Sequence, residues 1–108
     1  MKYLADHKKL LPEYIVAENV AHPAGDPHAE RRVRYHEEVV WHFPNNYGAS
    51  LAYNQATHWM PELAVTHIVN GECDLVYTTD ITSDVVPDVS VSQLAILLAR
   101  IRGLADAS

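Results

Sequence analysis

The chain has 108 residues, of which 48% are hydrophobic and 20% are charged, and its formal net charge is −6. This composition is typical of one globular domain and argues against a disordered chain, a coiled-coil rod or two independent domains. A net negative charge disfavours binding to a nucleic-acid backbone, and no apolar run is long enough to cross a bilayer. Without an apolar leader at its start, the chain is predicted to be cytoplasmic and to bind neither nucleic acid nor membrane.

The cysteine and the histidines limit the chemistry that the chain can perform. Cys73 is the single cysteine, so an intrachain disulfide and a cysteine-rich zinc site are both excluded. The seven histidines include no His-x-His or helical His-x-x-x-His pair. His36 and His42 are six residues apart, about 20 Å along an extended strand, and cannot share an ion. We therefore predict no metal and no cofactor.

The first part of the chain is the least regular, because prolines and a glycine interrupt each periodic pattern there. Residues 3–11 favour a short helix, residues 14–20 a strand or a helical turn, and residues 22–28 an exposed loop. We predict that residues 1–31 form an N-terminal arm, partly helical or irregular. Residues 32–108 are predicted to form a single α+β domain.

A regular alternation of apolar and polar residues follows the arm and is typical of a strand with one buried face. The residues expected on the buried face are Val33, Tyr35, Glu37, Val39, Trp41 and Phe43. Turn-forming residues fill positions 44–48, and residues 49–54 are predicted to return as a second strand. This part of the sequence therefore predicts a first hairpin.

A second hairpin is predicted around Asn70-Gly71, the strongest turn signal in the chain. Residues 62–69 and 72–78 form its strands, and the two-residue turn places His67 opposite Asp74. The loop before this hairpin carries Trp59 and Met60, which are costly to leave in water. We expect this loop either to fold back on the core or to face a partner.

A helix is predicted between Ser90 and Gly103. Ser90 is the N-cap residue, Gln93 is placed to complete a capping box, and Gly103 is suited to the C-terminal cap. Ile96 and Leu97 widen the apolar stripe beyond the arc that one sheet face requires. We expect the extra apolar surface to be covered by the N-terminal arm, by a second copy of the chain or by another partner.

The predicted fold is therefore α+β: an antiparallel sheet of about four strands in two hairpins, packed by the C-terminal helix, with the N-terminal arm beside it. Within this fold, a carboxylate at Asp74 could orient the His67 ring so that it acts as a general base. No nucleophile or oxyanion donor accompanies this pair, and the run at residues 79–84 is better explained as a loop of side-chain-to-backbone turns. An enzyme is consequently disfavoured.

Three segments of the sequence resemble a known family. They are Trp-His-Phe-Pro-Asn-Asn-Tyr-Gly-Ala-Ser-Leu at 41–51, Glu-Leu-Ala-Val at 62–65 and Tyr-Thr-Thr-Asp-Ile-Thr-Ser-Asp-Val at 77–85. With the C-terminal helix, they resemble small uncharacterised proteins encoded by actinobacteria and their bacteriophages, mycobacteriophages included. The resemblance covers residues 38–104. The chain departs from the family pattern at 78–80, where Thr-Thr-Asp stands in place of Asp-Thr-Pro. The resemblance implies no activity.

We expect a small non-enzymatic accessory protein, phage-encoded, that binds a host or phage protein. The predicted partner-binding residues are Tyr47, Trp59, Met60, Ile96 and Leu97, which are loop residues of the kind enriched in interfaces and residues of the spare helix face. A homo-oligomeric structural module is the alternative. Less favoured are a hydrolase that uses histidine and aspartate, a metal-binding protein and an acidic mimic of nucleic acid.

Overall fold

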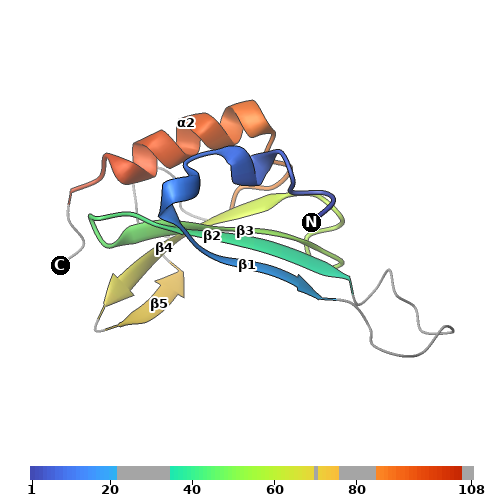
Figure 1. The fold of residues 1–108 in the computed structure, drawn as a ribbon, viewed down its shortest axis with the longest axis horizontal. Helices are drawn as coiled ribbons and strands as arrows, with labels where there is room; N and C mark the ends of the chain where they lie inside the picture. Colours follow the sequence, from blue (N-terminus) through green and yellow to red (C-terminus); the bar gives the residue numbers. More distant parts are fainter. Residues whose placement is uncertain (22–34, 70, 76–84, 106–108) are drawn as a thin grey trace, which may run out of the picture.

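The computed structural model describes residues 1–21, 35–69, 71–75 and 85–105. It contains a five-stranded antiparallel sheet with one C-terminal helix on one face (Figure 1). The strands are β1 (Ile15–Ala21), β2 (His36–His42), β3 (Tyr47–Asn54), β4 (Glu62–Val69) and β5 (Glu72–Leu75), and they follow this order across the sheet. The helix is α2 (Val91–Arg102), and two short 3-10 turns, η1 (His7–Lys9) and η2 (Pro12–Tyr14), precede β1. The predicted α+β fold is confirmed.

Both predicted hairpins are present. In the β2–β3 pair, His42 lies opposite Gly48 and His36 opposite Asn54. In the β4–β5 pair, His67 lies opposite Asp74, which is the register that the two-residue turn predicts. Asn70 lies outside the described residues, and the other turn residue, Gly71, has a positive φ of 82° that suits glycine.

The buried face of β2 also agrees with the sequence pattern. Glu37, Val39, Trp41 and Phe43 are each at most 1% exposed. Tyr35 is half-buried, and Val33 lies outside the described residues. These side chains meet α2 and the N-terminal segment in one hydrophobic core, whose largest members besides β2 are Leu4, Leu51, Leu63, Leu94, Leu98 and Ile101. Apolar and polar residues therefore separate onto opposite faces of the strand, apart from the buried Glu37 and from Val40, which lies on the other face.

Helix α2 begins and ends where its capping residues predict. The Ser90 side chain accepts a hydrogen bond from the backbone N–H of Gln93 at 3.1 Å, and Gly103 caps the other end. Asn45, in the turn between β2 and β3, adds a cap from outside the helix. Its amide nitrogen donates to the backbone carbonyls of Ile101, Arg102 and Leu104 at 2.9 to 3.1 Å. The first hairpin therefore fixes the C-terminal end of the helix.

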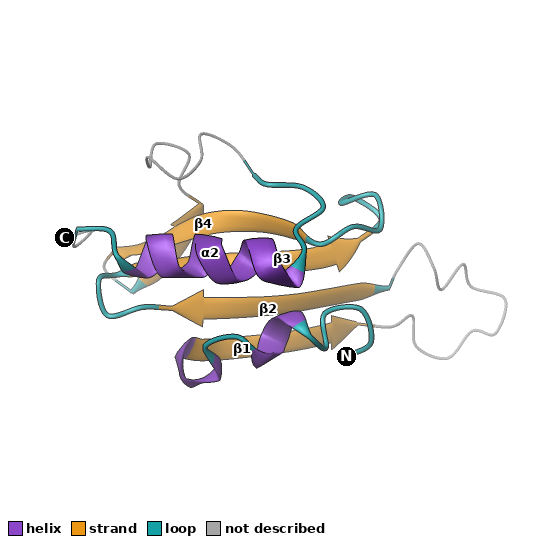
Figure 2. Ribbon diagram, turned by 90° about the horizontal axis from the view of Figure 1, so that it is seen from above, coloured by secondary structure: helices purple, strands orange, loops and turns teal. Residues whose placement is uncertain are grey.

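The N-terminal segment, residues 1–21, is partly helical, as expected for the arm, but it also belongs to the core. Figure 2 shows its 3-10 turns on the same face of the sheet as α2 and above β1 and β2. Leu4 is completely buried, and the Trp41 indole donates to the Leu10 carbonyl at 2.9 Å. The His7 ring bonds the Val89 carbonyl, also at 2.9 Å, just before α2. Residues 1–21 therefore share the core of the domain predicted at 32–108, and β1 adds a fifth strand to the four that were predicted.

The second face of the sheet carries mostly small or polar side chains and no described helix. Ser50, Ala52 and Ala64 lie on this face at the centre of the sheet and are half-buried. None of the helices in the described part of the chain is long and apolar enough to cross a bilayer.

Candidate binding site at one end of the sheet

A buried carboxylate organises one end of the sheet. Glu37 sits on the core face of β2 and is 0% exposed, although a carboxylate at such a position is costly unless it is hydrogen-bonded. Three successive backbone N–H groups of the N-terminal segment supply these bonds. Lys2 donates at 3.1 Å, Tyr3 at 3.0 Å to both carboxylate oxygens, and Leu4 at 2.9 Å. Consecutive amides that converge in this way form a typical anion-binding nest.

The Tyr35 hydroxyl is the fourth donor to the Glu37 carboxylate. Burial alone would raise the pKa of the Glu37 carboxyl. The hydrogen bonds from Tyr35, Tyr3, Leu4 and Lys2 outweigh burial and lower this pKa below its ordinary value. Burial, followed by the bond to Glu37 and the charge of that carboxylate, raises the pKa of Tyr35 to about 12. Glu37 is therefore held as an anion and Tyr35 as a neutral donor.

Four aromatic residues surround this arrangement, and we call Tyr3, Tyr35, Tyr53 and Trp59 the aromatic cluster. Tyr3 stacks on Tyr53 with ring centroids 4.2 Å apart and meets Tyr35 edge-on at 5.9 Å. Trp59 contacts Tyr53 at 5.7 Å. Both the stacked and the edge-on arrangements are favourable for aromatic pairs. The cluster joins the N-terminal segment, the start of β2, strand β3 and the loop that follows β3.

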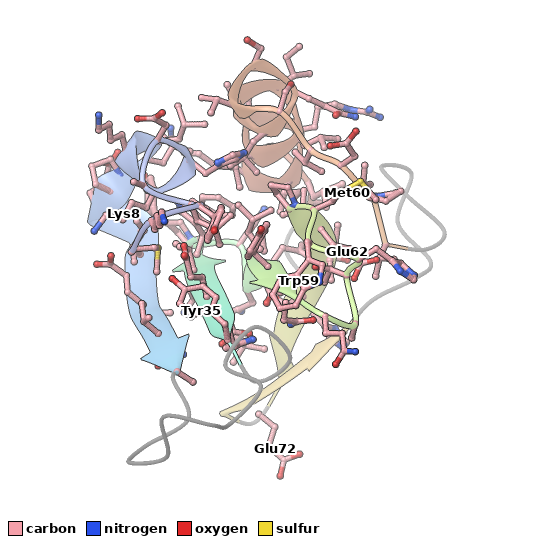
Figure 3. The ribbon with its side chains drawn as sticks, turned by 90° about the vertical axis from the view of Figure 1, so that its right-hand side faces the viewer. Lys8, Tyr35, Trp59, Met60, Glu62 and Glu72 are labelled. Carbon is pink, nitrogen blue, oxygen red and sulfur yellow. The ribbon has the colours of Figure 1, made fainter. Side chains whose placement is uncertain are left out.

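Part of the aromatic cluster is open to solvent. Tyr3 is 46% exposed, Tyr35 and Trp59 are half-buried, and Tyr53 is buried. Figure 3 looks onto this end of the molecule and labels Tyr35 and Trp59. The Lys2 amine lies 5.5 Å above the centre of the Tyr3 ring, within the range of a cation–π contact. The buried part of the cluster therefore fixes rings that are partly accessible to a partner.

The loop that presents Trp59 has an unusual backbone. Both His58 and Trp59 have positive φ angles, 55° and 58°, a region that costs a residue other than glycine about 1 kcal/mol or more. A compact turn holds the loop, because the Asn54 and Thr57 side chains each accept from the other residue's backbone N–H at 3.0 to 3.1 Å. The backbone N–H of Trp59 also donates to the backbone carbonyl of Asn54 at 3.0 Å. Strain of this kind is typical of functional loops.

The structure brings together only part of the predicted partner-binding set. Trp59 packs against the core from one side and belongs to the aromatic cluster, and Met60 follows it in the same loop, half-buried. Tyr47 is also half-buried against the core. Ile96 is 63% exposed on α2, whereas Leu97 is only 8% exposed and belongs to the core. Leu97 is therefore a packing residue within the described chain, because the apolar arc of α2 reaches further around the helix than expected.

The histidines remain scattered in the described part of the chain. Among those residues, no three His, Cys, Asp or Glu side chains come together as metal ligands would. His36 bonds the Asn54 amide at 3.1 Å instead. His67 and Asp74 are opposite each other in the backbone register, but the Asp74 side chain and residues 79–84 lie outside the described part.

The sequence does not predict that Tyr3, Tyr35 and Tyr53 gather with Trp59, or that Glu37 is hydrogen-bonded beneath them. Glu37 carries one available signal, because it is a carboxylate at an apolar position of an alternating strand. Nothing near Glu37 in the sequence indicates that its donors are the amides of residues 2–4, which are more than thirty positions away. The stacking of Tyr3 on Tyr53 depends on the same long-range contact.

No family model, no curated protein and no solved structure matches the chain.

Proposed function

We propose that the protein is a small non-enzymatic binding module and that the aromatic cluster, with Met60 beside Trp59, is its docking surface for another protein. The observation that carries this proposal is the fixed but partly exposed set of rings at Tyr3, Tyr35 and Trp59. Tyrosine and tryptophan are enriched among the few residues that contribute most of the binding energy of protein interfaces. Rings that are already held in place lose little conformational freedom on binding.

The buried carboxylate supports binding rather than catalysis. A general base must reach a substrate proton within about 3 Å. Glu37 is fully buried, and its two oxygens already accept bonds from three backbone amides and one hydroxyl. Its ionised form is therefore used inside the fold, where it fastens the N-terminal segment and so positions Tyr3.

The biological setting belongs to the same proposal. The resemblance to small actinobacterial and phage proteins supports a phage-encoded accessory role in the cytoplasm, with a host or phage protein as the partner. The net charge of −6 supports a protein partner over a nucleic acid.

A capture experiment with matched variants tests this proposal. Immobilised wild-type protein is exposed to a lysate of an actinobacterial host, next to a Trp59→Ser variant and an Ile96→Ser variant. Ile96 is the control because it is more exposed than Trp59 but lies on α2, outside the aromatic cluster. The unfolding temperature of each variant is first compared with that of the wild type. If the unfolding temperatures differ, the capture is carried out at a temperature where all three proteins are folded.

We expect the wild type and Ile96→Ser to retain one protein in stoichiometric amount. The amount that Trp59→Ser retains should be lower by about tenfold or more. Equal retention by all three would contradict the choice of surface. If Ile96→Ser alone lost the protein, the docking surface would be the helix face instead.

A further inference from the structure

The aromatic cluster is built on an anion whose charge no described cation balances. The donors to Glu37 are three backbone amides and the Tyr35 hydroxyl, and all of them are neutral groups. In the described part of the chain, no lysine, arginine or histidine forms an ion pair with Glu37. Tyr3 and Tyr35 both contact this carboxylate directly. Because salt screens a buried charge less than an exposed one, the charge of Glu37 acts on a cation that approaches these rings.

The rings themselves also attract a cation. The face of an aromatic ring is electron-rich and draws a positive charge that lies within about 6 Å of the ring centre. Tyr3 is 46% exposed, and Tyr53 stacks on its ring. The Lys2 amine already lies 5.5 Å from the centre of the Tyr3 ring. The chain's own lysine therefore shows that this surface accepts a cation.

A second carboxylate near Trp59 strengthens the negative character of this end. Glu62, the first residue of β4, lies three positions after Trp59 and is half-buried, and Figure 3 labels both residues at this end of the molecule. Glu62 also forms no ion pair with a described lysine, arginine or histidine. By contrast, the amines of Lys8 and Lys9 each lie within 3.2 Å of a carboxylate of the N-terminal segment or β1. Positive charge is therefore balanced around Lys8 and Lys9, and negative charge is left over at the aromatic cluster.

We propose that the docking surface binds an arginine side chain of the partner protein, with the guanidinium over the exposed ring of Tyr3, where the Lys2 amine now lies. This inference rests on the proposed function and adds the chemistry of the partner. Arginine suits the surface because its planar, weakly hydrated guanidinium stacks on aromatic rings. Arginine is also enriched, with tyrosine and tryptophan, among the residues that contribute most to binding. A basic partner segment matches the net charge of −6 as well.

This arrangement gives Lys2 a definite role, because its amine competes with the partner's arginine for the Tyr3 ring. Removal of the amine should therefore strengthen binding. Lys9 offers a matched control, since Lys9→Gln changes the net charge by the same amount as Lys2→Gln. The Lys9 amine pairs with Asp6 at 3.2 Å, both side chains are 76% exposed, and neither belongs to the aromatic cluster.

The test is an NMR titration of the full chain with two short peptides whose ends are acetylated and amidated. One peptide carries a single arginine between glycines and serines. The other carries citrulline instead, which has nearly the same shape as arginine but no charge. The ring signals of Tyr3 and the indole signal of Trp59 report binding in the wild type, Lys2→Gln and Lys9→Gln. A Tyr3→Leu variant, which keeps the backbone N–H that bonds Glu37, is followed through Trp59 alone.

We expect the arginine peptide to shift these signals saturably at millimolar concentrations and the citrulline peptide to bind about tenfold more weakly. Lys2→Gln should lower the dissociation constant of the arginine peptide about threefold more than Lys9→Gln does, and Tyr3→Leu should raise it about fivefold. No saturable shift, equal affinity for the two peptides or equal effects of the two lysine substitutions would each overturn the proposal.

The capture experiment separates this proposal from the one on which it rests. If the arginine peptide fails but Trp59→Ser still loses the lysate protein, the docking surface stands and the arginine is wrong. If all the captured amounts are equal, the docking surface itself is wrong.

Discussion

The N-terminal segment and helix α2 cover the same face of the sheet in two different ways. Helix α2 is held by apolar packing, with Leu94, Leu98 and Ile101 completely buried. The N-terminal segment buries Leu4, but its backbone is fastened by the Glu37 carboxylate through the amides of residues 2–4. Apolar packing is spread over many contacts, whereas one carboxylate binds all three amides of residues 2–4. A single substitution should therefore loosen residues 2–4 and leave the helix in place.

The largest effect is expected from Glu37→Gln. The amide keeps the shape of the side chain, but it removes the charge and points N–H donors toward backbone donors. We expect a loss of about 3 kcal/mol in the free energy of unfolding, measured by chemical denaturation. The matched control is Glu38→Gln, whose carboxylate on the other face accepts bonds from Asn19 and Ser50. That control should lose about 1 kcal/mol or less, and equal losses would contradict the special role of Glu37.

Acid should weaken the same attachment. The folded-state pKa of Glu37 is lowered, so its stabilisation is present above the unfolded value of about 4.3 and is lost as the pH falls through the folded value. In denaturation measured at several pH values, the wild type should therefore lose more stability below about pH 4 than Glu37→Gln does. Parallel curves for the two proteins would show that protonation of Glu37 is not linked to folding.

A smaller loss is expected from Tyr35→Phe, which removes the hydroxyl donor and keeps the ring. Because the lost bond goes to a charged acceptor, the free energy of unfolding should fall by about 2 kcal/mol. The high pKa of Tyr35, about 12, adds a check at alkaline pH. The stabilisation is present below the unfolded pKa of about 10 and is lost as the pH rises toward 12, so Tyr35→Phe should lack this alkaline loss.

The smallest effect is expected at helix α2. Ser90→Ala removes the side-chain acceptor for the Gln93 N–H at the start of α2 and should cost about 1 kcal/mol. Hydrogen exchange should quicken in the first turn of the helix while the amides of residues 2–4 keep their protection. If residues 2–4 and helix α2 both lost protection, their attachments to the sheet would not be independent.

Those parts of the fold that depend on local sequence were predictable. The alternation in β2, the turn at Gly71 and the caps of α2 each lie within a few residues of the structure that they specify. Strand β1 was less clear, because proline-rich surroundings and the short apolar run at residues 14–20 allow either a strand or a helical turn. Pairing with β2 selects the strand.

The candidate site was only partly predictable for the same reason. Trp59 and Met60 were expected to pack on the core or face a partner, and Trp59 does pack on the core from one side. Tyr3 reaches Tyr35 and Tyr53 because Glu37 binds the N-terminal amides, including that of Tyr3 itself. That contact joins residues 33 to 35 positions apart, and no periodic pattern in the sequence encodes it.

Hydrogen exchange at the amides of Lys2, Tyr3 and Leu4 tests most directly whether Glu37 holds the N-terminal segment in place. We predict that these amides exchange far more slowly than in an unstructured peptide. In Glu37→Gln, their protection should fall much more than that of the amides in the middle of α2. Rapid exchange at residues 2–4 of the wild type, while α2 stays protected, would contradict the proposed role of Glu37 and the aromatic cluster built on it.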